Sequence, residues 1–299
     1  MRTPFTGVGT ALVSPFTRSG SLDEAAVRRL ARRQIDAGVH FLCPCGTTGE
    51  SPTLTDAERL RTVEIVADEA NGRVPVLAGA GGYDTKEVLH LASEMQKAGA
   101  SGLLSVTPYY NKPTQEGLYQ HYRAIAEHTA LPIIVYNVPG RTGVNVEAAT
   151  LVRLAAVPHI VGVKEASGNV TQMCEICRVV PPDFLVLSGD DALTLPLMAV
   201  GGRGIISVAS NEIPAEMSQM VELAERGDFA GARALHQRLL PLMQVNFIES
   251  NPIPVKSAMA ILGLLEENYR LPMVPPRPAA KQRIEAVLQS LGISGGVHA

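Results

Sequence analysis

Short apolar segments alternate with longer amphipathic ones along most of the chain. Eight of them are rich in apolar and β-branched residues and do not alternate polar with apolar positions. That pattern is typical of strands buried on both faces. The predicted strands cover residues 7–13, 40–44, 74–78, 102–106, 132–136, 160–164, 185–187 and 204–208.

The segments between these strands read as helices, marked by their first and last residues. Ser21, Thr55 and Asp84 each offer a side-chain acceptor at an N-cap, with a glutamate three residues later. Glycines follow the first three helices, at Gly38, Gly72 and Gly99. Parallel strands need such crossovers, so eight repeats predict an α/β fold, a (β/α)8 TIM barrel. A doubly wound open sheet has the same alternation and stays an alternative.

The alternation stops after a predicted helix at residues 214–226. We therefore expect a barrel of residues 1–227 that carries the active site, followed by a C-terminal helical region of residues 228–299. Within that region, proline-rich connections separate three predicted helices, at 228–248, 254–265 and 279–291.

Composition narrows the classes of partner. The 299 residues include 26 Lys+Arg and 29 Asp+Glu, with no basic block, which argues against nucleic acid or an anionic membrane surface. No apolar stretch is long enough to span a membrane, and no signal peptide is evident, so we expect a cytoplasmic protein.

The content of charged residues is low. Only 18% of residues are charged, against about 25% in ordinary soluble domains. This deficit predicts that subunit contacts cover part of the surface.

The four cysteines are expected to be reduced and structural: Cys43, Cys45, Cys174 and Cys177. The second pair forms a C-x-x-C inside a predicted helix, whereas a redox motif is expected at a helix start, directly after a strand. No histidine or third cysteine lies at zinc-ligand spacing. A metal or redox role is the less favoured alternative.

Candidate chemistry gathers where the predicted strands end, since TIM-barrel active sites lie at the carboxyl ends. Hydroxyl groups, one lysine and one arginine occur there, without paired histidines or carboxylates for a metal. Neither a dinucleotide fingerprint nor a phosphate-binding loop motif is present, so we expect no metal or nucleotide cofactor. The segments concerned are 46–50, 107–111, 136–143, 164–168 and 188–191.

Lys164 is the sharpest of these signals, because it ends the apolar strand Ile-Val-Gly-Val. An unpaired lysine buried at a barrel mouth is desolvated, which favours the neutral amine that Schiff-base chemistry requires. The alternative is a rim lysine paired with Glu165 or with a neighbouring carboxylate. Gly201-Gly-Arg-Gly204 offers a competing phosphate site, but it precedes the last strand and reads better as a plain turn.

Other polar side chains could serve the same centre. Tyr136 ends the neighbouring strand, where its hydroxyl could move protons through Thr47, Thr48 and Tyr110. Arg141 could bind a carboxylate through two hydrogen bonds. The alternatives are an aromatic plug for the tyrosine, an ordinary turn for the threonines and a solvated loop charge for the arginine.

Several motifs together resemble the dihydrodipicolinate synthase family, a branch of the pyruvate-dependent class I aldolases that include N-acetylneuraminate lyase. The resemblance covers nearly the whole chain in order. Arg141-Thr-Gly143 and the double Tyr109-Tyr110 favour this branch over the sugar-acid lyases. The motifs are GTTGES at 46–51, TPYYNKP at 107–113, YNVPGRTG at 136–143, KEASGN at 164–169, SGDD at 188–191 and NPIPVK at 251–256.

The resemblance implies a lyase that condenses pyruvate with L-aspartate-4-semialdehyde on the route to diaminopimelate and lysine. It implies a covalent lysine–pyruvate imine, no metal or nucleotide, and a homotetramer built from tight dimers. A sibling aldolase acting on a sugar acid or another 2-oxo acid, and a catalytically silent binding protein, stay as alternatives.

The resemblance also implies residue roles. Lys164 would form the imine, Tyr136 would donate and accept protons, and Thr47 and Tyr110 would extend the relay, with Tyr110 reaching into a neighbouring subunit. The implied substrate contacts are Thr48 and the Ile206 backbone for pyruvate and Arg141 for the semialdehyde carboxylate. Gly189 is also among the implied substrate-binding residues.

Lysine feedback is expected to be weak or absent. At the positions that bind lysine in sensitive members, Glu87 and Tyr109 fit the pattern. Pro52, Asp56 and Tyr83 depart from the usual alanine or serine, histidine and asparagine.

Overall fold

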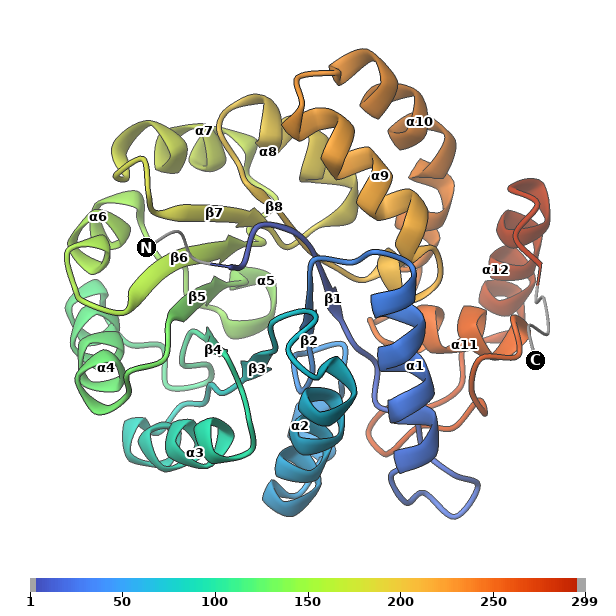
Figure 1. The fold of residues 1–299 in the computed structure, drawn as a ribbon, viewed down its shortest axis with the longest axis horizontal. Coiled ribbons are helices and arrows are strands. Elements are labelled where there is room, and N and C mark those ends of the chain that lie inside the picture. Colours follow the sequence, from blue (N-terminus) through green and yellow to red (C-terminus); the bar gives the residue numbers. More distant parts are fainter. Residues whose placement is uncertain (1–3, 295–299) are drawn as a thin grey trace.

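A ring of eight parallel strands forms the centre of the computed structural model, which describes residues 4–294 (Figure 1). The strand order is β2-β1-β8-β7-β6-β5-β4-β3, and a parallel bridge joins Leu42 of β2 to Val76, the residue just before β3. The sheet thus closes on itself, which confirms the TIM barrel and excludes the open sheet. The strands are β1 Gly7–Ala11, β2 Phe41–Cys43, β3 Leu77–Gly79, β4 Gly102–Val106, β5 Ile133–Asn137, β6 Ile160–Glu165, β7 Leu185–Ser188 and β8 Gly204–Ser207.

Helices surround this ring and connect successive strands. The main ones are α1 Glu24–Asp36, α2 Asp56–Ala70, α3 Thr85–Lys97, α4 Gln115–His128, α6 Ala148–Ala155, α7 Val170–Val179, α8 Thr194–Ala199 and α9 Pro214–Glu225. Short helical turns lie at α5 Pro139–Thr142, η1 Ser51–Thr53, η2 Asp191–Leu193 and η3 Ala209–Asn211.

Two of the three predicted N-caps are confirmed. Thr55 and Glu58 form both halves of a capping box on α2, and Asp84 accepts the backbone N–H of Lys86 on α3. Ser21 is wrong as the cap of α1, because Asp23 accepts the N–H of Ala26 instead. The chain is still extended at Leu22, which forms an antiparallel bridge with Phe16.

The prediction for β3 started too early. Pro75 cannot donate a hydrogen bond, and Val76 makes only the isolated bridge to Leu42, so the strand begins at Leu77. The other seven strands overlap their predicted ranges closely.

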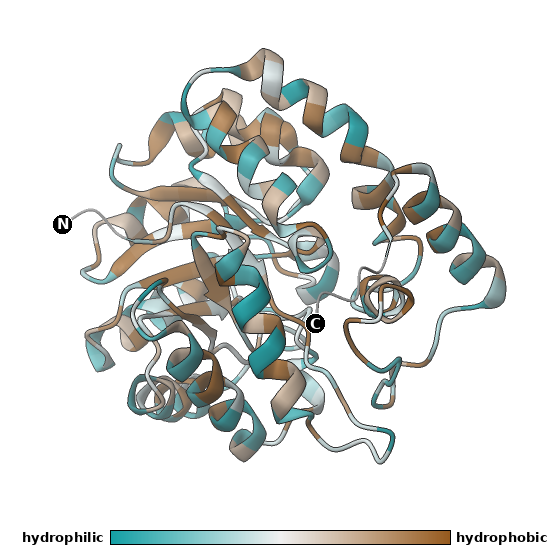
Figure 2. Ribbon diagram, turned by 45° about the vertical axis from the view of Figure 1, so that its right-hand side comes forward, coloured by the Kyte–Doolittle hydropathy of each residue, from teal (hydrophilic) through white to brown (hydrophobic). Residues whose placement is uncertain are grey.

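Apolar side chains fill both sides of the barrel wall. Inside the ring, Phe41, Leu104 and Ile134 belong to a compact cluster that also includes Tyr136 and Ile206. Outside it, the strands pack against the apolar faces of the helices, and Figure 2 shows brown strands with teal residues on the outer helix faces. Both faces of each strand are therefore buried, as the sequence pattern predicted.

Residues 201–204 form the turn into β8, at the barrel end opposite the carboxyl ends of the strands. Gly204 has a φ of +130°, and a side chain there would collide with the carbonyl of Gly7. The Arg203 guanidinium forms an ion pair with Glu225, with Nη2 and Oε1 3.8 Å apart. The plain-turn interpretation is therefore confirmed, and the phosphate-site alternative has no place at the mouth.

Three helices follow α9: α10 Phe229–Val245, α11 Ile253–Ile261 and α12 Pro278–Ser290, at the right of Figure 1. Val255 and Met259 of α11 pack against Val13 and Val208, which follow β1 and β8. The C-terminal chain thus contacts the carboxyl end of the barrel. Within residues 4–294, no helix combines the length and apolarity needed to cross a membrane.

Candidate active site

Lys164 and Tyr136 occupy paired positions on neighbouring strands at the barrel mouth. Lys164 is 5% exposed, and its Nζ lies 4.3 Å from the centre of the Tyr136 ring. Both are the last inward-facing residues of their strands. The structure therefore brings together the two side chains on which the predicted chemistry most depends.

Glu165 points away from Lys164, since successive residues of a strand face opposite sides. Its carboxylate accepts hydrogen bonds from the Asn137 amide at 2.9 Å and the Ser167 backbone N–H at 2.8 Å. Among the described residues, Lys164 has no ion-pair partner. The alternative of a rim lysine paired with Glu165 or with a neighbouring carboxylate is therefore wrong.

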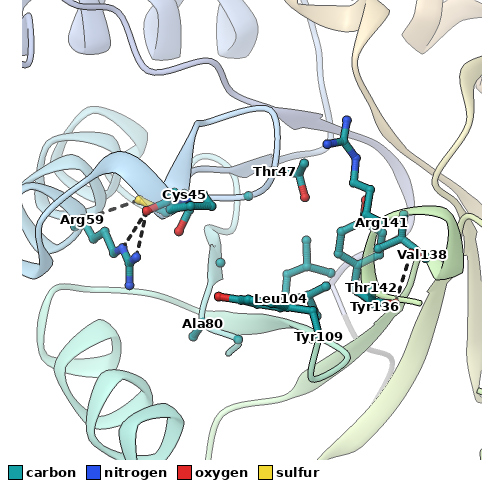
Figure 3. Close-up of a pocket in the computed structure, with 16 residues that line it drawn as sticks. Cys45, Thr47, Arg59, Ala80, Leu104, Tyr109, Tyr136, Val138, Arg141 and Thr142 are labelled. Atoms are coloured by element: carbon teal, nitrogen blue, oxygen red, sulfur yellow. Dashed lines mark hydrogen bonds between the residues drawn. The ribbon is translucent and has the colours of Figure 1, made fainter. Parts of the chain in front are cut away.

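A cavity of about 230 Å³ opens beside Tyr136. Three of the predicted site residues line it, namely Thr47, Tyr136 and Arg141. In Figure 3, Thr47 lies across from Tyr136 and Arg141, with Tyr109 and Leu104 at another side. Lys164 is not among the lining residues, but its Nζ lies on the ring of Tyr136, which is.

Asn251, in the segment before α11, connects two predicted binding residues. Its side-chain amide donates to the Thr48 hydroxyl at 3.0 Å, and its backbone carbonyl accepts from the Arg141 guanidinium at 3.0 Å. Thr48 is buried, and Arg141 is exposed at the rim yet anchored, so it is not a freely solvated charge. The sequence did not predict a role for Asn251 in the site. The one signal for it was its place in the NPIPVK motif at residues 251–256.

Gly189 lies close to the lysine. A Cβ at Gly189 would stand 3.0 Å from Lys164 Cε and 2.6 Å from Ala166 Cβ, so a side chain there would displace the lysine. Ile206 is fully buried in the inner cluster, on β8.

Cys43 belongs to the same inner cluster of the barrel as Ile206. Burial raises the pKa of the Cys43 thiol to about 12, although the positive charge of Lys164 opposes the shift. Cys43 is therefore a neutral thiol.

Tyr110 stands apart from the other predicted residues. It is 92% exposed, its backbone φ is +67°, and it does not line the cavity. Its neighbour Tyr109 does line the cavity, and its ring packs edge-on against the Tyr83 ring, with the ring centres 5.1 Å apart. Within one subunit, Tyr110 is thus presented outward and takes no part in the site.

A second cavity, of about 820 Å³, adjoins the first and shares lining residues with it. All five positions considered for lysine feedback line this space: Pro52, Asp56, Tyr83, Glu87 and Tyr109. Their grouping fits one binding site, whatever its ligand.

All four cysteines are free thiols. Cys43 and Cys45 are buried on and just after β2, and Cys174 and Cys177 lie within α7. Within residues 4–294, no group of three or more His, Cys, Asp or Glu side chains is placed to hold a metal ion.

Comparison with known proteins decides the family. The model of the dihydrodipicolinate synthetase family matches residues 4–291. The chain belongs to this family. A curated relative, 4-hydroxy-tetrahydrodipicolinate synthase of Koribacter versatilis, is 53% identical over 288 residues, which cover 96% of each chain.

Solved structures of the dihydrodipicolinate synthetase family agree with the fold. The enzyme from Aquifex aeolicus superposes with a TM-score of 0.95 at 43% identity, covering 97% of this chain and 99% of that one. Another neighbour, at 44% identity and a TM-score of 0.95, is described as the first monomeric dihydrodipicolinate synthase variant.

Proposed function

We propose that this enzyme joins pyruvate to L-aspartate-4-semialdehyde through a Schiff base on Lys164. Family membership supports the condensation itself, a lyase-type step of lysine and diaminopimelate biosynthesis. The observation that carries the residue assignment is the position of Lys164, which is buried beside Tyr136 and unpaired among the described residues.

The first steps make a nucleophile from pyruvate. The Lys164 amine adds to the keto carbon of pyruvate, and loss of water gives the protonated imine. This imine withdraws electrons, so the pyruvate methyl group loses a proton and becomes an enamine. Tyr136 moves these protons, relayed through Thr47 and through Tyr110 of a second subunit. Thr48 and the Ile206 backbone hold the pyruvate carboxylate, with Gly189 leaving room beside the lysine.

The later steps consume the semialdehyde. Arg141 binds its carboxylate at the rim, and the enamine carbon attacks its aldehyde carbon, forming the new C–C bond and a hydroxyl group. The substrate amine then displaces Lys164 from the imine carbon. The ring of 4-hydroxy-tetrahydrodipicolinate closes in this step and the lysine is regenerated.

This chemistry sets the remaining proposals. The imine supplies the electron sink, so we propose that neither a metal nor a nucleotide is required. Four free thiols fit a reducing compartment, which supports a cytoplasmic location.

We further propose a homotetramer of tight dimers, supported by the low charge content and the outward Tyr110. Residues 228–299 would form its C-terminal helical region.

A coupled assay tests the function. With pyruvate, aspartate-semialdehyde and the reductase that consumes the product, NADPH oxidation should depend on both substrates and persist in EDTA. Turnover of a sugar acid without turnover of the semialdehyde would favour a sibling aldolase. No turnover of either substrate class would favour a silent paralogue.

Lysine is expected to inhibit weakly or not at all. In the second cavity, Tyr83 is half exposed and packs on Tyr109, and Asp56 places an acidic group where sensitive members have histidine, which disfavours the carboxylate of lysine. The measurement is initial velocity against lysine concentration. Strong inhibition by lysine below about 1 mM, a concentration that corresponds to a binding free energy of roughly −4 kcal/mol, would contradict this expectation.

A further inference from the structure

Lys256, on the helix α11, is a fully buried charge that the reaction does not use. It is 0% exposed, and its Nζ lies 2.5 Å from Glu50 Oε1. The rings of Phe16 and Tyr269 flank the ammonium at 4.3 and 5.1 Å. Burial lowers the pKa of Lys256, and Glu50 opposes that shift. An ion buried this deeply needs its partner, because either charge left alone would be strongly destabilising.

Glu50 ends the tight turn that carries Thr47 and Thr48. Its N–H donates to the Thr47 carbonyl at 3.1 Å, and its own carbonyl accepts from Thr53. The φ of Glu50 is +51°, a left-handed conformation that is unfavourable for a residue with a Cβ. A strained residue at a functional turn persists only where its surroundings hold it. Here the buried ion pair holds it.

The same C-terminal segment holds the turn at a second point. Asn251 donates to the Thr48 hydroxyl, and the Lys256 backbone N–H donates to the Pro252 carbonyl, which keeps both tethers within one helical unit. Neither Lys256 nor Glu50 lines the cavity beside Tyr136. Any effect of the pair on chemistry therefore acts through the placement of the two threonines.

We propose that Lys256 and Glu50 are positioning residues, which fix the Thr47 and Thr48 hydroxyls for imine formation at Lys164. The inference rests on the proposed function. A misplacement of about 1 Å can cost as much as 100-fold in rate, so loss of the pair should slow the step in which pyruvate becomes covalently bound.

The test neutralises the pair and follows two readouts. Glu50→Gln/Lys256→Met removes both charges while keeping similar volumes, which avoids stranding one buried ion. We expect the rate constant for borohydride-trapped pyruvate adduct to fall at least about tenfold, with Tm close to that of the unmodified enzyme. The matched control is Glu249→Gln/Arg277→Met, which removes an ion pair between two C-terminal segments and leaves the turn untouched. It should trap pyruvate at the normal rate.

Glu50→Asp provides a second variant in case the double variant does not fold. It keeps both charges but shortens the carboxylate by one methylene, so the turn must shift to restore the contact. Normal trapping rates in a folded double variant, or in Glu50→Asp, would overturn the proposal. If the unmodified enzyme formed no adduct at all, the proposed function would fail instead, so the two failures are distinguishable.

Discussion

Replacing Lys164 by alanine is expected to abolish the borohydride-stable adduct with pyruvate and to lower kcat by at least about 1,000-fold. The amine is the group that becomes covalently attached. Among the described residues, the one other buried lysine is Lys256, whose ammonium is paired with Glu50. Peptide mass analysis after reduction should place the added mass of reduced pyruvate on the peptide that contains Lys164.

Two further variants sharpen this result. Lys164→Arg keeps the positive charge but cannot form the imine, so it should be as inactive as the alanine variant. Lys112→Ala changes an exposed lysine near the mouth and should trap pyruvate normally. An adduct that persisted in Lys164→Ala, or that mapped to another lysine, would refute the assignment.

Tyr110→Phe is expected to lower kcat by about 100-fold, the effect of losing one member of a proton relay. Tyr110 is 92% exposed and absent from the cavity of its own subunit, so it can act only in a neighbouring site. Two inactive variants should therefore rescue each other. In a mixed dimer of Tyr110→Phe and Lys164→Ala, one of the two sites receives both native side chains.

Random exchange of subunits makes half of the dimers mixed, so activity should recover to about a quarter of that of the unmodified enzyme. Mixing Lys164→Ala with Thr47→Val is the control, because those two residues belong to the same subunit's site and should not complement. A mixture that stayed as inactive as its parents would exclude the shared site. A fully active monomer would also refute the link drawn between the 18% charged residues and assembly.

The barrel and the Lys164–Tyr136 pair could be predicted because both follow from local pattern. Strands buried on two faces have a recognisable sequence, and the ends of neighbouring parallel strands must meet. Local pattern was less reliable where tertiary contacts compete with it. At α1, the bridge from Phe16 to Leu22 moved the cap from Ser21 to Asp23.

The ties from Glu50 to Lys256 and from Thr48 to Asn251 could not be derived from the residues alone. Each joins positions more than 200 residues apart, and no periodicity links such distant partners. One signal was present, since a lysine within Ile-Pro-Val-Lys-Ser-Ala-Met-Ala-Ile stands in an almost wholly apolar helix. Such a lysine needs a buried acidic partner, but the sequence offers 29 acidic residues to choose from.

These long-range contacts determine when a newly synthesised chain can complete its catalytic centre. Ribosomes deliver the chain from its N-terminus at roughly 5–20 residues per second, so Lys164 and Tyr136 emerge well before Asn251 and Lys256 do. Until α11 leaves the exit tunnel, Glu50 lacks its partner and the turn bearing Thr47 has no anchor. Translation that stops after α9 would therefore release a chain containing every strand of the barrel but no finished catalytic centre.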